Sequence, residues 1–226
     1  MSDHATLGLP SLSRRMLAMV GAATLTLGIS ATFLPGFAQQ AAPAAGDDIA
    51  KPGELGDIII GKADAPVTII EYASMTCPHC ATFHNTVLPT LKQKYVDPGK
   101  VRIIFREFPL DNVAAAVSML ARCAGGDKAP AVVAKFFETQ EQWAFVKTSP
   151  LPGMLKVAET VGFTKESFDK CLTDQKIMDG VLAVGDRGKK FGVKSTPSFF
   201  INGTKIDGRA DQIATFEKAI EPLLKK

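Results

Sequence analysis

The chain has 226 residues, of which 46% are apolar and 22% are charged, and its net charge is +3. These values are typical of a soluble globular protein with one domain of ordinary size. The small positive charge is not gathered in a basic run or in a patch shared with aromatic residues, so we expect no nucleic-acid partner.

The first 38 residues have the layout of an export signal. The pair Arg14 and Arg15 precedes an apolar run over 16–34, and small residues at positions 36 and 38 suit cleavage after Ala38. The arginine pair and the Gly/Ala/Thr-rich run resemble a twin-arginine signal, with ordinary Sec export as the alternative. The run is also long enough to stay uncleaved as a membrane anchor. We therefore expect an exported protein with a signal peptide over 1–38.

The next segments predict a linker and the first half of a domain. Residues 39–56 are rich in Ala, Pro and Gly and lack a periodic apolar face, which indicates a flexible linker. Short β-branched runs predict strands over 57–60, 67–73 and 101–108. Apolar residues on one helical face predict a helix over 78–95, with Pro89 kinking or interrupting it.

The second half begins with a long helical stretch. Residues 112–190 show no strand signal and predict several helices, one of which has Thr164 as N-cap and Ser167 at the capping-box position. Two short strands then flank Asn202-Gly203, a strong hairpin signal, and a helix closes the chain. The order β-β-α-β, helical block, β-β-α predicts an α/β domain over 57–225 with a mixed central sheet and a helical insertion at 112–190.

The chemistry concentrates in Cys77-Pro78-His79-Cys80, at the start of the predicted helix. A helix N-terminus stabilises a thiolate through its free N–H groups and its dipole, and Pro78 costs little in the first turn. Since His79 adds a donor or a positive charge, we expect a lowered pKa for Cys77, which makes the disulfide form a strong oxidant. Cys80, one turn further in, is expected to be buried and to resolve the mixed disulfide. Beside a βαβ pattern, this spacing indicates a thioredoxin-like redox motif.

Glu71 and the pair Thr196-Pro197 are the other candidate site residues. Strand alternation points Glu71 inward, where a carboxylate is costly unless it is paired or functional, so we expect it to take or relay the Cys80 proton. A surface position on an edge strand is the alternative. A cis Thr196-Pro197 bond would turn the Thr196 backbone toward a substrate chain and leave room beside the sulfurs.

Together these residues resemble the DsbA-type disulfide oxidoreductases, which have a thioredoxin fold. The resemblance covers 57–225 and rests on the E-x5-C-P-H-C segment, the helical insertion and the late T-P strand. It implies a periplasmic enzyme that introduces disulfides into reduced, unfolded exported proteins and works without a cofactor as a monomer. It also implies a membrane quinone-linked partner that re-oxidises it. In this reading Cys77 is the nucleophile, Cys80 the resolving thiol, Glu71 the buried acid, Pro197 the cis-proline, and His79 with Pro78 tunes the disulfide.

One residue departs from the family pattern. The best-known oxidases have Val before the cis-proline, whereas Thr, as at Thr196, occurs in isomerase-type relatives. An isomerase or reductase of the same fold therefore stays open, as does a thioredoxin-fold chaperone without turnover. The lead-in over 39–56 is too short for the dimerisation domain of such isomerases, which favours the oxidase.

The remaining cysteines, Cys123 and Cys171, both lie in the helical block. A bond between them would enclose about 48 residues and stabilise the fold by roughly 4 kcal/mol. It resembles the second, non-catalytic disulfide of a subset of DsbA-like proteins, with free buried thiols or a regulatory bond as alternatives. We expect no metal site, because zinc prefers four ligands and no second ligand pair accompanies Cys77, Cys80 and His84. His84 is expected to face solvent or pack, and Trp143 and Phe136-Phe137 to be core residues.

Overall fold

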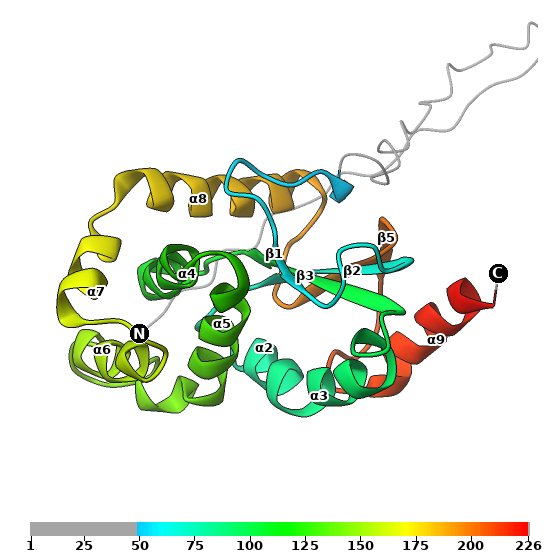
Figure 1. The fold of residues 1–226 in the computed structure, drawn as a ribbon, viewed down its shortest axis with the longest axis horizontal. Helices are drawn as coiled ribbons and strands as arrows, with labels where there is room; N and C mark the ends of the chain where they lie inside the picture. Colours follow the sequence, from blue (N-terminus) through cyan, green and yellow to red (C-terminus); the bar gives the residue numbers. More distant parts are fainter. Residues whose placement is uncertain (1–48, 226) are drawn as a thin grey trace, which may run out of the picture. The chain divides into compact units, whose positions relative to one another are not determined.

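The computed structural model describes residues 49–225, so the predicted signal peptide over 1–38 and the first part of the predicted linker lie outside it. Within the described range, five strands form one mixed sheet in the order β1-β3-β2-β4-β5 (Figure 1). They are β1 (Ile58–Ile60), β2 (Val67–Ala73), β3 (Val101–Glu107), β4 (Ser198–Ile201) and β5 (Thr204–Ile206). The predicted fold class, an α/β domain with a mixed central sheet, is confirmed.

Strand β2 is the middle of the sheet. It pairs in parallel with β3 and antiparallel with β4, and Glu71 lies opposite Phe105 on one side and Phe199 on the other. The edge position that we considered for Glu71 is therefore wrong. Strands β4 and β5 are joined at Asn202 and Gly203, which have φ of 45° and 83°. Two positive φ values are what a tight hairpin of this kind needs, so the predicted turn is confirmed.

Helices cover both faces of the sheet (Figure 1). Helix α8 (Gln175–Lys190) packs on the face that carries Ile70 and Tyr72. Gly188 permits this approach, because a Cβ there would lie 2.8 Å from the Tyr72 ring. On the opposite face lie α9 (Ile213–Leu224) and the helical segment that follows β2.

That helical segment alternates between α turns and wider π turns. It comprises α2 (Pro78–Thr82), η1 (Phe83–Val87), α3 (Leu88–Leu91) and η2 (Lys92–Val96). Pro89 has no N–H and its ring clashes with a regular α-helical backbone. Just before it, the Leu88 N–H bonds to the carbonyl of Phe83, five residues earlier. The predicted interruption thus takes the form of a π turn, and the segment stays helical across the proline.

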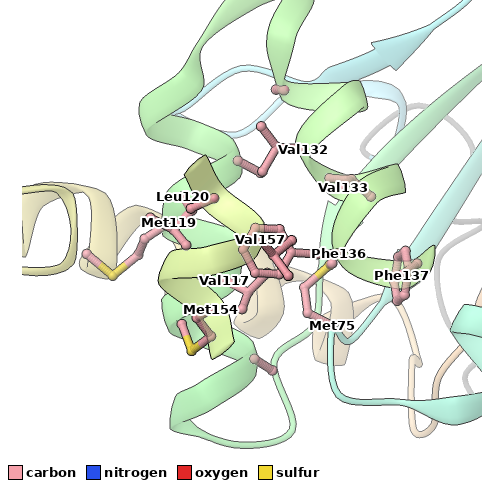
Figure 2. Close-up of a cluster of buried hydrophobic side chains, with 14 of the residues drawn as sticks. Met75, Val117, Met119, Leu120, Val132, Val133, Phe136, Phe137, Met154 and Val157 are labelled. Carbon is pink, nitrogen blue, oxygen red and sulfur yellow. The ribbon is translucent and has the colours of Figure 1, made fainter. Parts of the chain in front are cut away.

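The block between β3 and β4 is largely helical, and its core includes Met75 of the loop after β2 (Figure 2) as well as strand residues such as Phe105. Besides α8 it contains α4 (Asn112–Ala124), η3 (Gly126–Lys128), α5 (Ala129–Glu138), η4 (Gln140–Gln142), α6 (Leu151–Thr160) and α7 (Lys165–Leu172). Trp143 and the pair Phe136-Phe137 are buried, as expected for core residues. Thr164 and Ser167 cap α7 reciprocally, so the predicted capping box is confirmed.

Residues 49–56 pack against the domain, although their composition indicated a flexible linker. Ile49 is fully buried, and Arg106 donates hydrogen bonds to the carbonyls of Ile49 (2.6 Å) and Lys51 (3.0 Å). Arg122 likewise donates to the carbonyl of Leu55 at 3.1 Å. Two arginines bind main-chain carbonyls here, a kind of contact that the composition of the bound segment does not reveal. The packed part of the chain thus includes residues from Ile49 onward.

Candidate redox site

Cys77 and Cys80 lie at the beginning of α2, where the chain leaves the central strand. Cys77 is the N-cap residue, and its carbonyl accepts hydrogen bonds from the N–H groups of Cys80 (3.1 Å) and Ala81 (3.2 Å). Both cysteines are free thiols. The Cys77 side is the more accessible, with 6% of the residue exposed, while Cys80 is fully buried. A partner sulfur can therefore reach Cys77, and Cys80 is positioned to react only within the protein.

The surroundings of Cys77 favour its thiolate. They lower the pKa of Cys77 from 9.0 to about 5, chiefly through the hydrogen bond with the Cys80 thiol. Partial burial opposes this shift, whereas Thr196 and the backbone N–H groups of Cys80 and His79 add to it. His79 contributes to this shift through its backbone N–H, at the N-terminus of α2. The expected donor is thus present, but it comes from the helix N-terminus.

Cys80 has the opposite preference. Burial raises its pKa above the ordinary value, the hydrogen bond to Cys77 raises it further, and the nearby carboxylate of Glu71 adds a Coulombic contribution of the same sign. At neutral pH the reduced site therefore holds one thiolate, on Cys77, and one thiol, on Cys80. Cys77 can therefore attack or leave as a thiolate, whereas Cys80 must lose a proton before it attacks.

Thr196 and Pro197 immediately precede β4, and Thr196 contacts the sulfur of Cys77. The Thr196-Pro197 peptide bond is cis, as expected from the sequence. Sγ of Cys77 lies 3.4 Å from the Thr196 carbonyl oxygen, to which the thiol donates in its protonated form; this contact joins positions 119 residues apart. The Thr196 hydroxyl is buried without a hydrogen-bond partner among the described residues, yet it is close enough to Cys77 to favour the thiolate.

Glu71 is fully buried and has a partner that sequence reasoning missed. Its Oε2 lies 2.9 Å from Nε2 of His84, and the side chains are 0% and 2% exposed. His84 stacks on Phe137 with 4.2 Å between ring centroids. The expectation that His84 faces solvent is wrong. His84 packs, as the alternative expected, but it also contacts the Glu71 carboxylate. A signal was present, because His84 lies four residues after Cys80 and so on the inward face of the same helix.

Two further residues hold the loop that carries Cys77. The buried Gln140 side chain donates to the carbonyls of Met75 (2.7 Å) and Cys77 (3.1 Å). The Thr76 hydroxyl donates to Asp111 at 2.7 Å, and Asp111 is also the N-cap of α4. The helical block therefore fixes the redox loop through both its first helix and η4. No sequence pattern singles out Gln140, since its contacts depend on how the block docks.

A cavity of about 550 Å³ lies between the exposed part of the redox motif and the cis-proline. Its wall contains His79, Thr82, Thr196, Pro197, Arg209, Ala210 and Asp211. It brings the exposed side chain of the redox motif together with the cis-proline. A polypeptide segment bound here would lie next to Cys77.

A family model described as thioredoxin matches residues 54–222. The chain belongs to the thioredoxin family. Among its relatives, a Rickettsia bellii protein named as a protein-disulfide oxidoreductase is 34% identical over 171 residues, which is 73% of this chain and 65% of that protein. A Bacillus anthracis protein named as disulfide bond formation protein D is 31% identical over 74% of this chain and 78% of its own length. This thioredoxin-family chain thus spans just under two thirds of the Rickettsia relative.

The solved structures agree with the family assignment. The alpha-DsbA1 protein of Wolbachia pipientis superposes with a TM-score of 0.73 at 30% identity, over 80% of this chain and 96% of that one. The resemblance to DsbA proteins that the C-P-H-C segment suggested is therefore confirmed. Within residues 49–225, none of the helices combines the length and the apolar character needed to cross a membrane.

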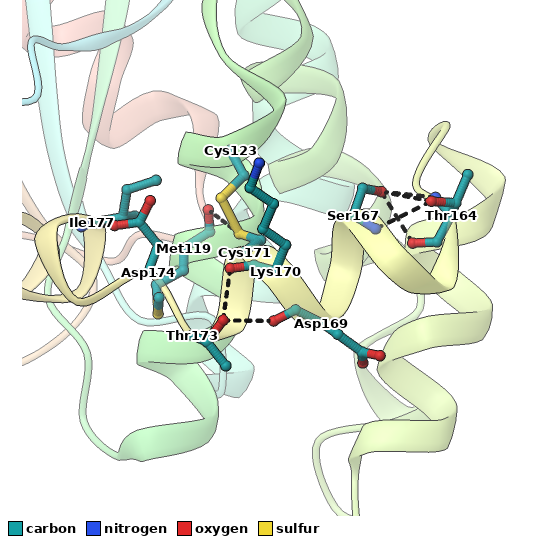
Figure 3. Close-up of a disulfide and its surroundings, with 10 residues drawn as sticks. All are labelled: Met119, Cys123, Thr164, Ser167, Asp169, Lys170, Cys171, Thr173, Asp174 and Ile177. Atoms are coloured by element: carbon teal, nitrogen blue, oxygen red, sulfur yellow. Dashed lines mark hydrogen bonds between the residues drawn. A yellow bond between two sulfur atoms is a disulfide. The ribbon is translucent and has the colours of Figure 1, made fainter.

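The second cysteine pair of this thioredoxin-family chain is bonded (Figure 3). Cys123 at the end of α4 and Cys171 in α7 form a disulfide with Cα atoms 6.0 Å apart. The free-thiol alternative is wrong for this structure. Cys171 is buried, and the bond links two helices of the insertion.

Proposed function

We propose that the chain is an exported thiol:disulfide oxidoreductase that introduces disulfides into reduced, unfolded substrate proteins through Cys77 and Cys80. The observation that carries this proposal is the thiolate of Cys77, whose pKa is lowered to about 5. Stabilising this thiolate stabilises the dithiol form, so the disulfide form gains when it passes its oxidising equivalents to a substrate.

The exchange takes two steps. A substrate thiolate attacks Sγ of Cys77 in the enzyme disulfide, a substrate–Cys77 bond forms, and Cys80 leaves and takes up a proton. A second substrate thiolate then attacks the substrate sulfur of the mixed disulfide. The substrate disulfide forms and Cys77 leaves as a thiolate. The substrate loses two electrons and the enzyme gains them.

Partners and location follow from this chemistry and from the family. The cavity beside Cys77 suits an extended chain, so the substrates would be unfolded exported proteins that still carry thiols. A membrane quinone-linked protein would re-oxidise the enzyme, which would act as a periplasmic monomer after export through the signal at 1–38. We assign Glu71 as the buried acid, His79 and Pro78 as tuning residues, Thr196 and Pro197 as substrate contacts, and Cys123–Cys171 as a structural bond.

The redox potential of the Cys77–Cys80 pair tests the direction. Equilibration with glutathione should give a value well above that of thioredoxin (about −270 mV), toward the DsbA range of about −120 mV. A value near thioredoxin's would refute the oxidase. Cys77→Ala should abolish oxidation of a reduced unfolded protein. In Cys80→Ser, Cys77 can still attack a disulfide of a substrate protein, and the mixed disulfides that accumulate because Cys80 cannot release them should identify the substrates.

An isomerase or reductase of the same fold is the second candidate, favoured by Thr196 before the cis-proline. It predicts that the enzyme restores scrambled disulfides faster than it forms new ones in a reduced chain. A chaperone without turnover predicts that Cys77→Ala keeps full activity toward unfolded substrates. Comparing reduced and scrambled forms of one substrate protein separates the three.

A further inference from the structure

The pair formed by Glu71 and His84 is the least satisfied polar group in the described core. Each side chain is almost completely shielded from solvent, and they share a single contact at 2.9 Å. Oε1 of Glu71 and Nδ1 of His84 have no hydrogen-bond partner among the described residues. Buried polar atoms are nearly always bonded, because an unbonded one costs roughly 1–3 kcal/mol. A pair kept only for stability would not be expected to retain two such atoms.

The ring contacts and strand neighbours of the pair are aromatic. Phe105 on β3 and Phe199 on β4 lie opposite Glu71, and Phe137 on α5 stacks on His84. From α2 the titratable group nearby is Cys80, on which the Glu71 carboxylate acts electrostatically. Glu71 is therefore close enough to act electrostatically on the sulfur that must gain and lose a proton in each catalytic cycle.

His84 also reaches a cavity that the redox chemistry described above does not use. This cavity has a volume of about 600 Å³, and its wall includes His84, Leu88, Lys92, Asp97, Asp127 and Ala131. Its titratable members other than His84 are Lys92, Asp97 and Asp127. It shares no lining residue with the cavity beside Cys77 and Pro197. When a substrate occupies the cavity beside Cys77 and Pro197, solvent can still enter the second cavity, whose wall includes His84.

We propose that His84 is a positioning residue that works through Glu71 to move the Cys80 proton to and from this second cavity. When Cys80 leaves as a thiolate, Glu71 supplies a proton and His84 replaces it from water in the cavity. When the enzyme is re-oxidised, the Cys80 proton passes to Glu71, and His84 returns one to solvent. The imidazole can hold a proton on either nitrogen. Nε2 contacts Glu71, and Nδ1, which is buried without a protein partner among the described residues, would exchange its proton with the cavity when the ring moves toward it.

This inference rests on the proposed exchange at Cys77 and Cys80, but its test does not depend on the direction of catalysis. The mixed disulfide of Cys77 with glutathione is prepared at low pH, and release of glutathione by Cys80 is followed after a jump to pH 6, 7 or 8. A reductase or isomerase would pass through the same step. The redox potential of the Cys77–Cys80 pair could thus refute the oxidase while this assay still supports proton transfer through Glu71 and His84. Equally, the assay could refute that proton transfer while the potential supports the oxidase.

In the wild-type protein, glutathione release should vary little between pH 6 and 8 and should slow in deuterium oxide. His84→Gln keeps an amide that can bond Glu71 but cannot relay a proton. It should slow release about 100-fold at pH 6, and the rate should then rise about tenfold per pH unit as hydroxide replaces the relay. Glu71→Gln should give the same profile, and the double variant should be no slower than either single one.

The matched control is Gln93→Ala, an exposed residue in the same cavity wall, which should leave the profile unchanged. If His84→Gln lowers the rate by one factor at every pH, the residue is structural and the relay is wrong. If neither variant folds, the wild-type solvent isotope effect decides, because an absent effect overturns the proposal. The cavity route has its own test in His84→Ala. Added imidazole should restore release in that variant and leave Glu71→Gln unaffected, and no restoration would contradict the route.

Discussion

Acidification should destabilise the reduced protein far more than the oxidised one. The folded-state pKa of Cys77 is about 5, against 9.0 for an ordinary cysteine. Because the folded value is the lower one, the associated stability is complete above pH 9 and is lost as pH falls through 5. At pH 7, two units above the folded pKa, the thiolate contributes about 3 kcal/mol, and near pH 4 almost nothing. Cys80 adds no pH dependence in this window, because its raised pKa keeps it protonated in both states.

The measurement is a pair of urea unfolding series, one on the reduced protein and one on the protein with the Cys77–Cys80 disulfide, from pH 4 to pH 8. Subtracting the two free energies of unfolding at each pH cancels every ionisation that the two forms share. The difference should change in favour of the reduced form by about 3 kcal/mol between pH 4 and pH 7. Because stabilising the reduced form raises the reduction potential of the Cys77–Cys80 pair, this change corresponds to about 60 mV at pH 7.

A difference that stays constant within about 1 kcal/mol over this range would show that Cys77 titrates alike in the folded and unfolded chain. The oxidising character would then need another cause, such as destabilisation of the disulfide form. The result would also remove the argument that the helix N-terminus and Cys80 stabilise the thiolate.

Three other changes give distinct results. Thr196→Val removes a group that favours the thiolate, so the pKa of Cys77 should rise, as read from the ultraviolet absorbance of the thiolate. Replacing both Cys123 and Cys171 by Ser should lower the free energy of unfolding by about 4 kcal/mol, the value for a separation of 48 residues. The pKa of Cys77 should stay unchanged, and a shifted pKa would favour a regulatory role for the disulfide. Gln140→Leu removes the side-chain donor to the buried Met75 carbonyl, while the Cys77 carbonyl keeps its bonds from the N–H groups of Cys80 and Ala81. The change should cost about 1–3 kcal/mol in urea unfolding, whereas no loss would mean that the loop holds itself.

The sequence predicted the parts of the site that depend on local rules. The spacing of Cys77 and Cys80 at a helix start, and the inward direction of Glu71 on an alternating strand, follow from element periodicity. The hairpin at Asn202-Gly203 follows from turn chemistry. The family resemblance supplied Pro197, because nothing local ties it to a sulfur 120 positions earlier.

What the sequence could not predict depends on docking between elements. His84 and Glu71 come from a helix and a strand whose contact is set by the π turn over Phe83–Val87 and by packing on the sheet. Gln140 reaches the redox loop only because the helical block folds back over it. The anchoring of residues from Ile49 depends on two buried arginines elsewhere in the chain. Apart from the four-residue spacing of Cys80 and His84, none of these contacts leaves a periodic trace in the sequence.

The sequence separation of 119 between Cys77 and Thr196 has a consequence for the order in which the chain acquires its chemistry. A ribosome makes the C-P-H-C segment early, and the strand that brings Thr196 comes only after the whole helical block. Contacts between such distant positions form late, because closing a long loop costs entropy before the contact repays it. Until β4 pairs with β2, the Cys77 sulfur lacks part of what stabilises its thiolate. A half-made chain would thus carry a more ordinary thiol pair, and full reactivity would arrive together with the finished fold.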